Sequence, residues 1–271
     1  RDLHSFPTRR SSDLVLTRQF VHVSSRVLVT AVHGRTVLSG AWSRMIPMTA
    51  REILETTDWS HLVHAYGTGA DDVAALETLL GSDEEAMMRA AEVLDSAYLH
   101  QSTMFPATPP AVAFVLAVLS EWATAAQEHS VAPDLLVWIE EVGWSLYPYL
   151  DDVRSRSFDH GAQDRIAAAL DADELDWEEQ AEDLEQVLSN AAVCLLELAP
   201  TVVKTLESLS TDHAHGITRA VLRAAIPWVI IAKDENVAPV IVARLGQLPD
   251  DLPPAWRDDV VSDLKELKAR L

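Results

Sequence analysis

Residue types that could do chemistry are few in this sequence, and their spacing falls short of the sites they suggest. His213 and His215, beside Asp212, resemble two ligands of a zinc site. Zinc sites in proteins use at least three protein ligands, and the neighbouring sequence offers no third one at a fixed spacing. We therefore predict no metal site and no cofactor.

A calcium-binding loop is the second candidate. Asp171, Asp173 and Glu182 occupy positions one, three and twelve of the calcium-loop template. Leu175 stands at position five, and Asp176 stands where the template requires glycine. The template therefore fails at two of its defining positions.

Cys194 is the only cysteine, so the chain cannot form an intrachain disulfide. It lies between Val193 and Leu195, an apolar setting typical of an inert buried thiol rather than a nucleophile. A chain that needs no disulfide suits a reducing compartment, and we expect a cytoplasmic protein.

The turn from His100 to Thr108 is the first candidate binding site. Four polar side chains gather there that packing does not require: His100, Gln101, Thr103 and Thr108. They could contact a partner. They could equally cap helix ends and satisfy backbone groups within the turn, which is the commoner use of such residues.

The second candidate is the acidic stretch Asp171–Glu185, in which nine of fifteen residues are Asp or Glu. Apolar residues recur beneath the acids at steps of three and four, which predicts a solvated helix face: Trp177, Ala181, Leu184, Leu188, Ala191 and Leu195. Its candidate contacts with a basic partner protein are Asp173, Glu174, Glu178 and Glu179. The alternative is that this charge only provides solubility.

The elements that must position these residues read as helical hairpins. Residues 82–121 contain two amphipathic helical patterns joined by a proline-rich turn. The first pattern opens with Ser82 and Glu85 in capping-box spacing and places Met88, Ala91, Leu94 and Tyr98 on one face. The second opens with Thr108 as N-cap. Such a hairpin cannot bury both faces alone, so it predicts similar neighbours on either side.

A register of prolines supports repetition of this unit. Pro110, Pro200 and Pro239 are predicted to begin second helices, and each has the same apolar residue types two, six and nine positions later. The step of 39 residues from Pro200 to Pro239 is close to a HEAT or armadillo repeat, and the step of 90 from Pro110 is about two. The sequence therefore predicts an all-α fold over 48–271, a right-handed α-solenoid of HEAT/armadillo-like hairpins.

Charge restricts the partners. The first 47 residues hold 7 of the 21 Lys and Arg and 2 of the 42 Asp and Glu, so the remainder has 14 basic and 40 acidic residues and a net charge of −26. Such a field repels phosphate backbones and anionic membranes, so we expect neither nucleic acid nor membrane as partner. The longest apolar runs, Ala111–Leu119 and Ala224–Ala232, are also shorter than the roughly 20 residues of a spanning helix.

The first 47 residues differ from the rest. Residues 1–14 resemble, at every position, the translation of a sequencing adapter, and we exclude them from the fold. Residues 15–47 hold four Arg and no acid, so we expect a peripheral segment or one that is not part of the protein, with a small hairpin as the alternative. Met48 then reads as the start, because Thr49 and Glu52 form a capping box.

The segment from Asp58 to Leu119 resembles uncharacterised bacterial HEAT-repeat proteins, especially those of actinobacteria. The resemblance rests on these residues: Asp58-Trp59, Ala65-Tyr66-Gly67, His100-Gln101-x-Thr103, Pro106-Ala107-Thr108 and Ala111-Val112. The pattern has Gly where Ser102 stands and Tyr where Phe105 stands. It implies a helical-repeat fold and a binding role, and it supplies no agreed catalytic residues.

These observations together predict a non-enzymatic module for protein–protein interaction, an adaptor, scaffold or inhibitor that binds its partner on the concave face of the array. The alternative is an enzyme on the same scaffold, such as a HEAT-like lyase, which would show a deep, aromatic-lined pocket. A glycosylase would need a basic groove, which the net charge disfavours.

Overall fold

The computed structural model describes residues 48–153, 159–172, 179–209, 215–233 and 237–246, with Ser262, Lys265 and Ala269. Helices hold most of these residues, which confirms the all-α prediction. The described part has one small sheet, in which β1 (Val63–His64) pairs antiparallel with β2 (Gly67–Thr68). The interpretations of residues 1–14 and 15–47 concern residues outside this part.

The longer helices are α2 (Ala50–Thr56), α3 (Val73–Glu77), α4 (Glu84–Val93), α5 (Thr108–Thr124), α6 (Ala132–Leu146), α7 (Leu150–Val153), α8 (His160–Asp171), α9 (Ala181–Leu209), α10 (His215–Ala232) and α11 (Val237–Gly246). Short 3₁₀ turns connect them: Trp59–His61, Gly69–Asp71, Thr78–Leu80, His100–Ser102 and Tyr147–Tyr149. A π-helical turn, Leu94–Tyr98, extends α4.

The helix starts test the predicted caps. The capping box of Thr49 and Glu52 is present in both directions, since each side chain accepts a hydrogen bond from the other residue's backbone N–H, at 3.2 and 2.7 Å. The predicted box at Ser82 is wrong. Asp83 caps α4 instead, accepting from the N–H groups of Glu85 and Ala86. An aspartate carboxylate at this position satisfies two otherwise unpaired donors and favours the helix dipole.

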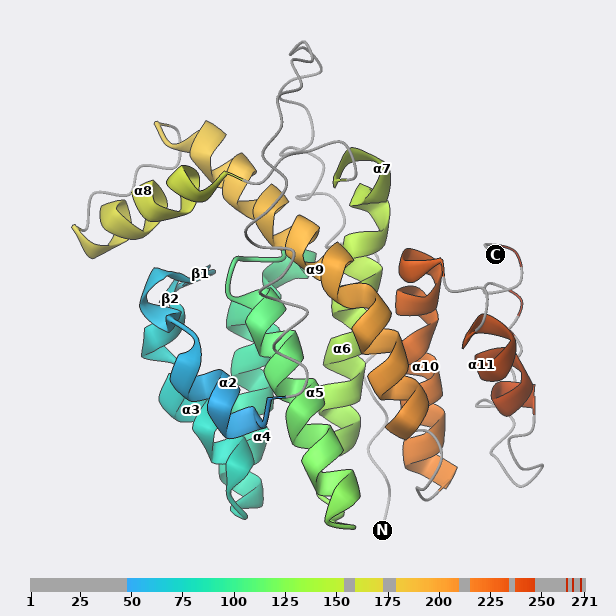
Figure 1. Ribbon diagram of the computed structural model, residues 1–271. Coiled ribbons are helices and arrows are strands. Elements are labelled where there is room, and N and C mark those ends of the chain that lie inside the picture. Colours follow the sequence, from blue (N-terminus) through green and yellow to red (C-terminus); the bar gives the residue numbers. More distant parts are fainter. Residues whose placement is uncertain are drawn as a thin grey trace. The chain divides into compact units, whose positions relative to one another are not determined.

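Two rows of helices form the main body of the described part: α2, α5 and α9 make one, and α4, α6 and α10 make the other (Figure 1). In one row α5 packs between α2 and α9, and in the other α6 packs between α4 and α10. Contacts between α9 and α10 join the rows at one end, and α11 packs on both of these helices. Within each row, the helices therefore follow one another in space in the same order as in the sequence.

The predicted proline register is wrong at Pro200, which lies in the long helix α9. Pro200 lies inside α9 and begins no helix, although it removes one backbone hydrogen bond there. Because α9 packs directly on α5, the 90 residues between Pro110 and Pro200 make one step in the row and not two. The additional residues form α7, α8 and the first half of α9.

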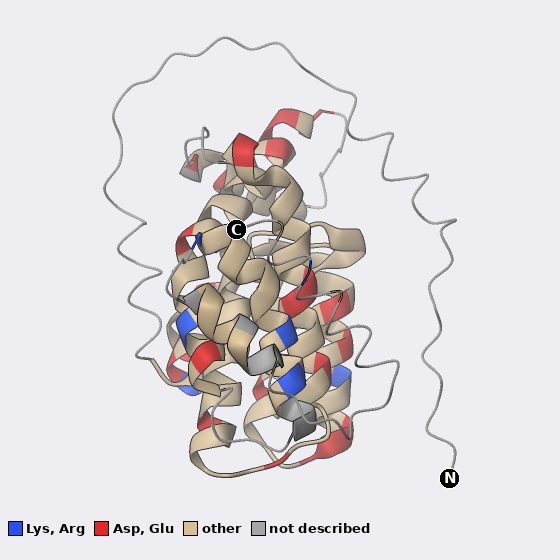
Figure 2. Ribbon diagram, turned by 90° about the vertical axis from the view of Figure 1, so that its right-hand side faces the viewer, with Lys and Arg blue, Asp and Glu red and all other residues tan. Residues whose placement is uncertain are grey.

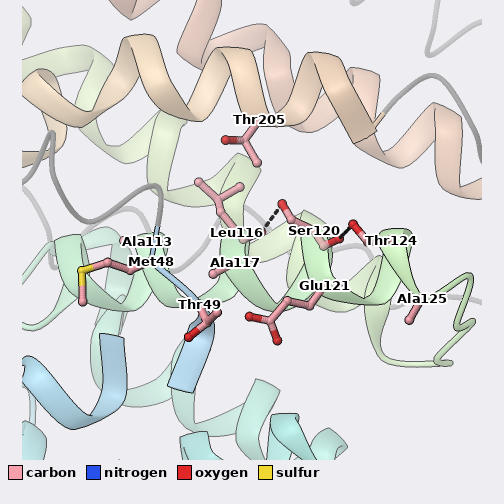
Figure 3. A pocket seen from close by; sticks show the side chains of 10 residues that line it. All are labelled: Met48, Thr49, Ala113, Leu116, Ala117, Ser120, Glu121, Thr124, Ala125 and Thr205. Atoms are coloured by element: carbon pink, nitrogen blue, oxygen red, sulfur yellow. Dashed lines mark hydrogen bonds between the residues drawn. The ribbon is translucent and has the colours of Figure 1, made fainter. Parts of the chain in front are cut away.

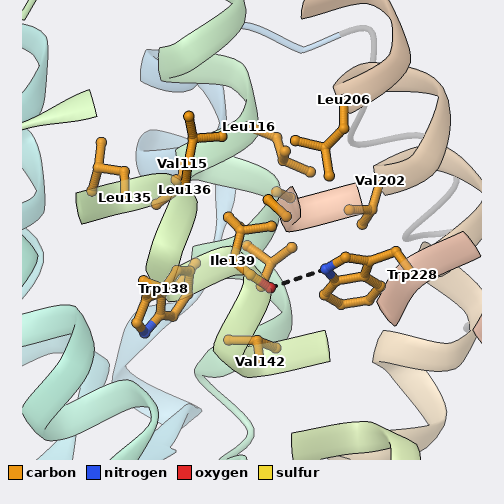
Figure 4. Packing of buried hydrophobic residues seen from close by; sticks show 14 of the residues in the cluster. Val115, Leu116, Leu135, Leu136, Trp138, Ile139, Val142, Val202, Leu206 and Trp228 are labelled. Atoms are coloured by element: carbon orange, nitrogen blue, oxygen red, sulfur yellow. Dashed lines mark hydrogen bonds between the residues drawn. The ribbon is translucent and has the colours of Figure 1, made fainter. Parts of the chain in front are cut away.

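The register of apolar residues is nevertheless buried as predicted. Leu116 of α5 and Leu206 of α9 are buried against one another's helices, and Val202 and Ile139 are fully buried beside them (Figure 4). The side chain of Leu245, the third member of the register, lies outside the described residues. Burial of these apolar surfaces is the main stabilising contribution in a fold of this kind.

The helices α6 and α10 approach each other closely in the core, at Gly143 and Pro227. A Cβ added at Gly143 would lie 2.7 Å from Cγ and 2.9 Å from Cβ of Pro227, so only glycine fits there. The neighbouring Trp228 is fully buried, and its indole Nε1 donates to the carbonyl of Ile139 at 3.0 Å (Figure 4).

The inserted helix α8 packs on the first half of α9. A small apolar cluster joins them to β1, and it consists of Val63, Ala162, Ile166, Ala167 and Val187. Arg165 makes a two-pronged ion pair with Asp183 across the two helices, which lowers the pKa of Asp183. The Gln163 amide donates to the carbonyl of His61 at 2.9 Å. The insertion is thus attached to the hairpin near the start of the chain.

Among the described helices, α9 has the length and apolar composition to cross a membrane, and 56% of its most apolar window is buried inside the protein. Core helices of globular proteins meet the same test, and the buried side of α9 packs on α5 and α10.

Candidate interaction surface

The predicted binding turn lies beside the β1–β2 hairpin. The N–H of Ala65 donates to the carbonyl of Ala97 at 3.0 Å, and the N–H of Ala107 donates to the carbonyl of Val63 at 3.2 Å. These bonds join two segments that are more than thirty residues apart. We call the combined region the hairpin–turn surface: the hairpin Val63–Thr68, the carboxylates Asp71 and Asp72, and the turn His100–Thr103.

His100 contacts Tyr66, which stands at the tip of the hairpin. The Nδ1 atom of His100 lies 3.2 Å from the Tyr66 hydroxyl and 3.1 Å from the carbonyl oxygen of Ser96. The two rings meet edge to face with centroids 5.3 Å apart. Tyr66 is nonetheless 68% exposed, so His100 orients an aromatic side chain that remains largely in solvent.

Gln101 and Ser102 hold the turn in an uncommon conformation. Their φ angles are +50° and +63°, in the left-handed region where non-glycine residues are strained. Both side chains are exposed, whereas Thr103 is half-buried and its N–H donates to the carbonyl of His100 at 2.9 Å. The left-handed φ of Ser102 is one that glycine adopts without strain.

Thr108 does not belong to this surface, and it is not the N-cap of α5. It is fully buried; its hydroxyl donates to the carbonyl of Tyr98 and accepts from the N–H of Phe105 at 2.8 Å. Ala107 occupies the N-cap position and makes no side-chain bond there. Of the four predicted turn residues, Thr108 therefore has the structural role, because it closes the turn from inside.

The structure also brings together a buried His–Asp pair that the sequence interpretation missed. The Nε2 atom of His64 lies 2.9 Å from Asp72, while Nδ1 accepts from the N–H of Tyr66 at 3.1 Å. Burial lowers the pKa of His64, and the Asp72 carboxylate opposes that shift. The ring packs on Tyr98, whose buried hydroxyl has no hydrogen-bond partner and whose pKa burial raises strongly.

This pair has the composition of a catalytic dyad without its geometry. A general base needs one free imidazole nitrogen for the substrate proton, and both nitrogens of His64 face groups of the protein. The ring is also almost completely shielded from solvent. His64 instead connects the hairpin turn to Asp72, at the start of α3. The only sequence signal was a histidine eight residues before an aspartate, which is too common to be diagnostic.

A second cluster joins α4 to the loop between α5 and α6. The Glu84 carboxylate lies 2.8 Å from Nδ1 of His129, accepts from the N–H of Ser130 at 3.1 Å and also accepts from the Ser130 hydroxyl. These bonds lower the pKa of Glu84, the Ser130 hydroxyl most of all. Because the serine bonds to the carboxylate and not to the histidine, the cluster does not activate a nucleophile.

The predicted acidic face falls mostly outside the described residues. Asp173, Glu174 and Glu178 are outside the described part of the chain. Glu179 was predicted to lie in a helix, but it is exposed in the turn that precedes α9. On the ribbon of Figure 2, acidic residues outnumber basic ones in the described part of the chain. Of the residues considered for chemistry, Cys194 is buried as predicted, and the described residues hold no group of three or more potential ligands placed for a metal ion.

A cavity of about 370 Å³ lies where α2, α5 and α9 meet (Figure 3). Its lining comprises Met48, Thr49, Ala113, Leu116, Ala117, Ser120, Glu121, Thr124, Ala125 and Thr205. No aromatic side chain is among them. Glu121 accepts from the N–H of Ala50 at 2.7 Å, and Ser120 and Thr124 donate to carbonyls of their own helix. The lining thus offers apolar surface and little free hydrogen-bonding capacity.

Comparisons with protein-family models, with curated proteins and with solved structures found no match to this chain. The case for function therefore depends on geometry and charge.

Proposed function

We propose that this protein is a non-enzymatic protein–protein interaction module of the cytoplasm, an adaptor, scaffold or inhibitor built on a HEAT-like right-handed α-solenoid. The observation that carries the proposal is the pairing of helices into two rows, α2–α5–α9 and α4–α6–α10. Rows of this kind present extended surfaces, which helical-repeat proteins use for binding.

The α2–α5–α9 row is the face that we propose for the partner, as the concave side of the array. It carries the cavity of about 370 Å³, whose rim includes the exposed residues Glu121, Thr124 and Ala125. A hollow with an apolar floor and a polar rim is the pattern of a contact site for another protein. The absence of aromatic residues from its lining disfavours the alternative, a HEAT-like lyase with an aromatic-lined pocket.

Charge supports a protein partner over a nucleic acid or a membrane surface. Between residues 52 and 153 the sequence has one Lys or Arg, Arg89, whose guanidinium lies 2.7 Å from Glu85. Nucleic-acid binding depends on clustered cations that release counterions, and this region supplies none.

Photocrosslinking tests the proposal. A photoreactive amino acid replaces Thr124 on the cavity rim, and a matched variant carries it at Glu92, which is exposed on α4 in the other row. In cells of the source organism, we expect one protein adduct that forms at Thr124 and not at Glu92, identified by mass spectrometry. Equal labelling at both positions, or none at Thr124, contradicts the proposed face.

The enzyme alternative has its own readout. Native mass spectrometry of the purified full chain would detect a small molecule retained by the cavity. Loss of that molecule in the variant Ala117→Trp, which fills the cavity, would favour an enzyme over an interaction module. We expect no such molecule.

A further inference from the structure

We propose that the hairpin–turn surface binds an arginine side chain of a basic segment in the partner protein, with the guanidinium against Tyr66 and Asp71. The inference rests on the proposed function and assigns part of the binding to a second surface, away from the cavity.

Tyr66 is the aromatic half of this site. It is 68% exposed, more than the other large hydrophobic side chains described as exposed. A side chain so exposed normally samples several rotamers, but the contact of its hydroxyl and ring edge with His100 restricts Tyr66. The ring is therefore oriented before any ligand arrives, which reduces the entropy lost on binding.

Asp71 is the acidic half. Gly67 follows Tyr66 in the chain, and a Cβ added at Gly67 would lie 2.9 Å from Oδ2 of Asp71, so the missing side chain lets this carboxylate lie against the hairpin. Asp71 is exposed, and it makes no ion pair among those described, whereas Asp72 lies 2.9 Å from Nε2 of the buried His64. Burial lowers the pKa of His64, and the charges of both Asp72 and Asp71 oppose that shift, so Asp71 lies near the His64 ring while its own side chain remains exposed to solvent.

Cations of the protein do not neutralise this surface in the described part of the chain. Arg89 pairs with Glu85, and Arg165 of the neighbouring α8 pairs with Asp183 and Asp159. The acids that remain exposed nearby are Asp71 itself, Asp95 beside the Ser96 contact of His100, and Asp164 beside Gln163. The local field therefore attracts a cation from outside.

Arginine fits this arrangement better than lysine. A planar guanidinium can stack on an aromatic ring and at the same time donate to a carboxylate, whereas an ammonium is a compact, strongly hydrated charge. Phosphate-bearing ligands are repelled by the same field. The chemistry of the surface therefore selects an arginine-containing peptide segment.

The test uses the full chain and two fluorescein-labelled probes, a peptide of four arginines with glycine spacers and its lysine counterpart, followed by fluorescence anisotropy. We expect tighter binding of the arginine peptide. Tyr66→Leu and Asp71→Asn should each weaken it about fivefold, and Tyr66→Phe, which keeps the ring, should change it less than about twofold.

Glu128→Gln is the matched control, because it also removes one exposed carboxylate. Glu128 follows the far end of α5, a helix of 17 residues and so roughly 25 Å long, and α5 begins just after the turn. We expect less than about a twofold effect. An effect equal to that of Asp71→Asn shows a diffuse field, and the inference then fails. It fails equally if Tyr66→Leu binds as the wild type does, or if the two peptides bind alike.

The outcomes separate this inference from the proposed function. Retention of the Thr124 adduct in a chain that fails the peptide test overturns only the arginine site. Loss of the Thr124 adduct overturns the proposed face even where the peptide binds. Circular dichroism of each variant should match the wild type, since Tyr66, Asp71 and Glu128 are exposed.

Discussion

The crossing of α6 and α10 and the hairpin–turn surface use glycine, aromatic rings and hydrogen bonds in opposite ways. At the crossing, Gly143 lets two backbones approach, and Trp228 is fully buried with its indole N–H bonded to a carbonyl. At the hairpin, Gly67 lets a carboxylate approach, and Tyr66 is exposed and oriented by a histidine. The first arrangement is complete without a ligand, whereas the second leaves an oriented ring and a charge in solvent.

This difference separates residues that maintain the fold from residues that are free to bind. On the buried side of the hairpin and the adjoining turn, Thr108 and His64 bond to backbone groups. On the exposed side of the turn, Gln101 and Ser102 adopt strained φ angles. Substitutions at the crossing should therefore cost most in stability, those under the hairpin less, and those on its exposed side least.

The largest effect is expected for Gly143→Ala. The added methyl would meet the rigid ring of Pro227, so overpacking should lower the free energy of unfolding by about 3 kcal/mol. Urea denaturation followed by circular dichroism measures this change. Gly161→Ala is the control, since its new methyl meets only the ends of two exposed side chains, Arg165 at 2.8 Å and Asp159 at 3.4 Å, and should change stability by less than about 0.5 kcal/mol. Equal losses of stability in Gly143→Ala and Gly161→Ala would show that the backbone freedom of glycine, and not the close approach to Pro227, explains the effect.

Thr108→Val should cost about 2 kcal/mol, because it keeps the shape of the side chain while leaving the N–H of Phe105 and the carbonyl of Tyr98 without their shared partner. The same denaturation experiment applies. Thr103→Val removes a hydroxyl from a half-buried position in the same turn, and we expect less than about 0.5 kcal/mol. A neutral Thr108→Val would contradict the role of this hydroxyl in closing the turn.

The buried His64 should make stability depend on pH. Its folded pKa lies below the unfolded value of about 6.5, so the unfolded state binds more protons between these two values. The contribution of neutral His64 to the free energy of unfolding is therefore complete above about pH 6.5 and is lost as pH falls toward the folded pKa. The free energy of unfolding then decreases by at most about 1.4 kcal/mol per pH unit. Unfolding from pH 7 to 5 should show a shallower slope in His64→Gln than in the wild type. A slope in His64→Gln equal to that of the wild type would exclude His64 as the cause.

Ser102→Gly should have the smallest effect, a gain of about 0.5 kcal/mol. Glycine removes the strain of φ +63°, and the greater entropy of the unfolded chain offsets part of that gain. Thermal unfolding would detect a small rise in midpoint. A loss of stability would mean that the serine contributes an interaction that outweighs the strain.

The sequence by itself determined the helical class and the burial of part of the core, although Met88, predicted on the apolar face of its helix, is 41% exposed and Met87 is buried instead. Leu116, Leu206 and Cys194 were assigned to the interior from their apolar neighbours, and the Thr49–Glu52 capping box was predicted from its spacing. These features depend on interactions within one or two helical turns, where residue types and periodicity carry the information.

Tertiary structure decided what the sequence pattern could not. Pro200 matched the register of Pro110 but lies inside α9, because packing of the first half of α9 on α8 stabilises helix on both sides of the proline. Likewise, Tyr66 contacts His100, and Glu84 contacts His129, only because the fold brings together segments that are 34 and 45 residues apart in the sequence. Helix periodicity specifies which face of a helix is apolar, but the partner of that face, and hence every contact between distant segments, depends on packing of the whole chain.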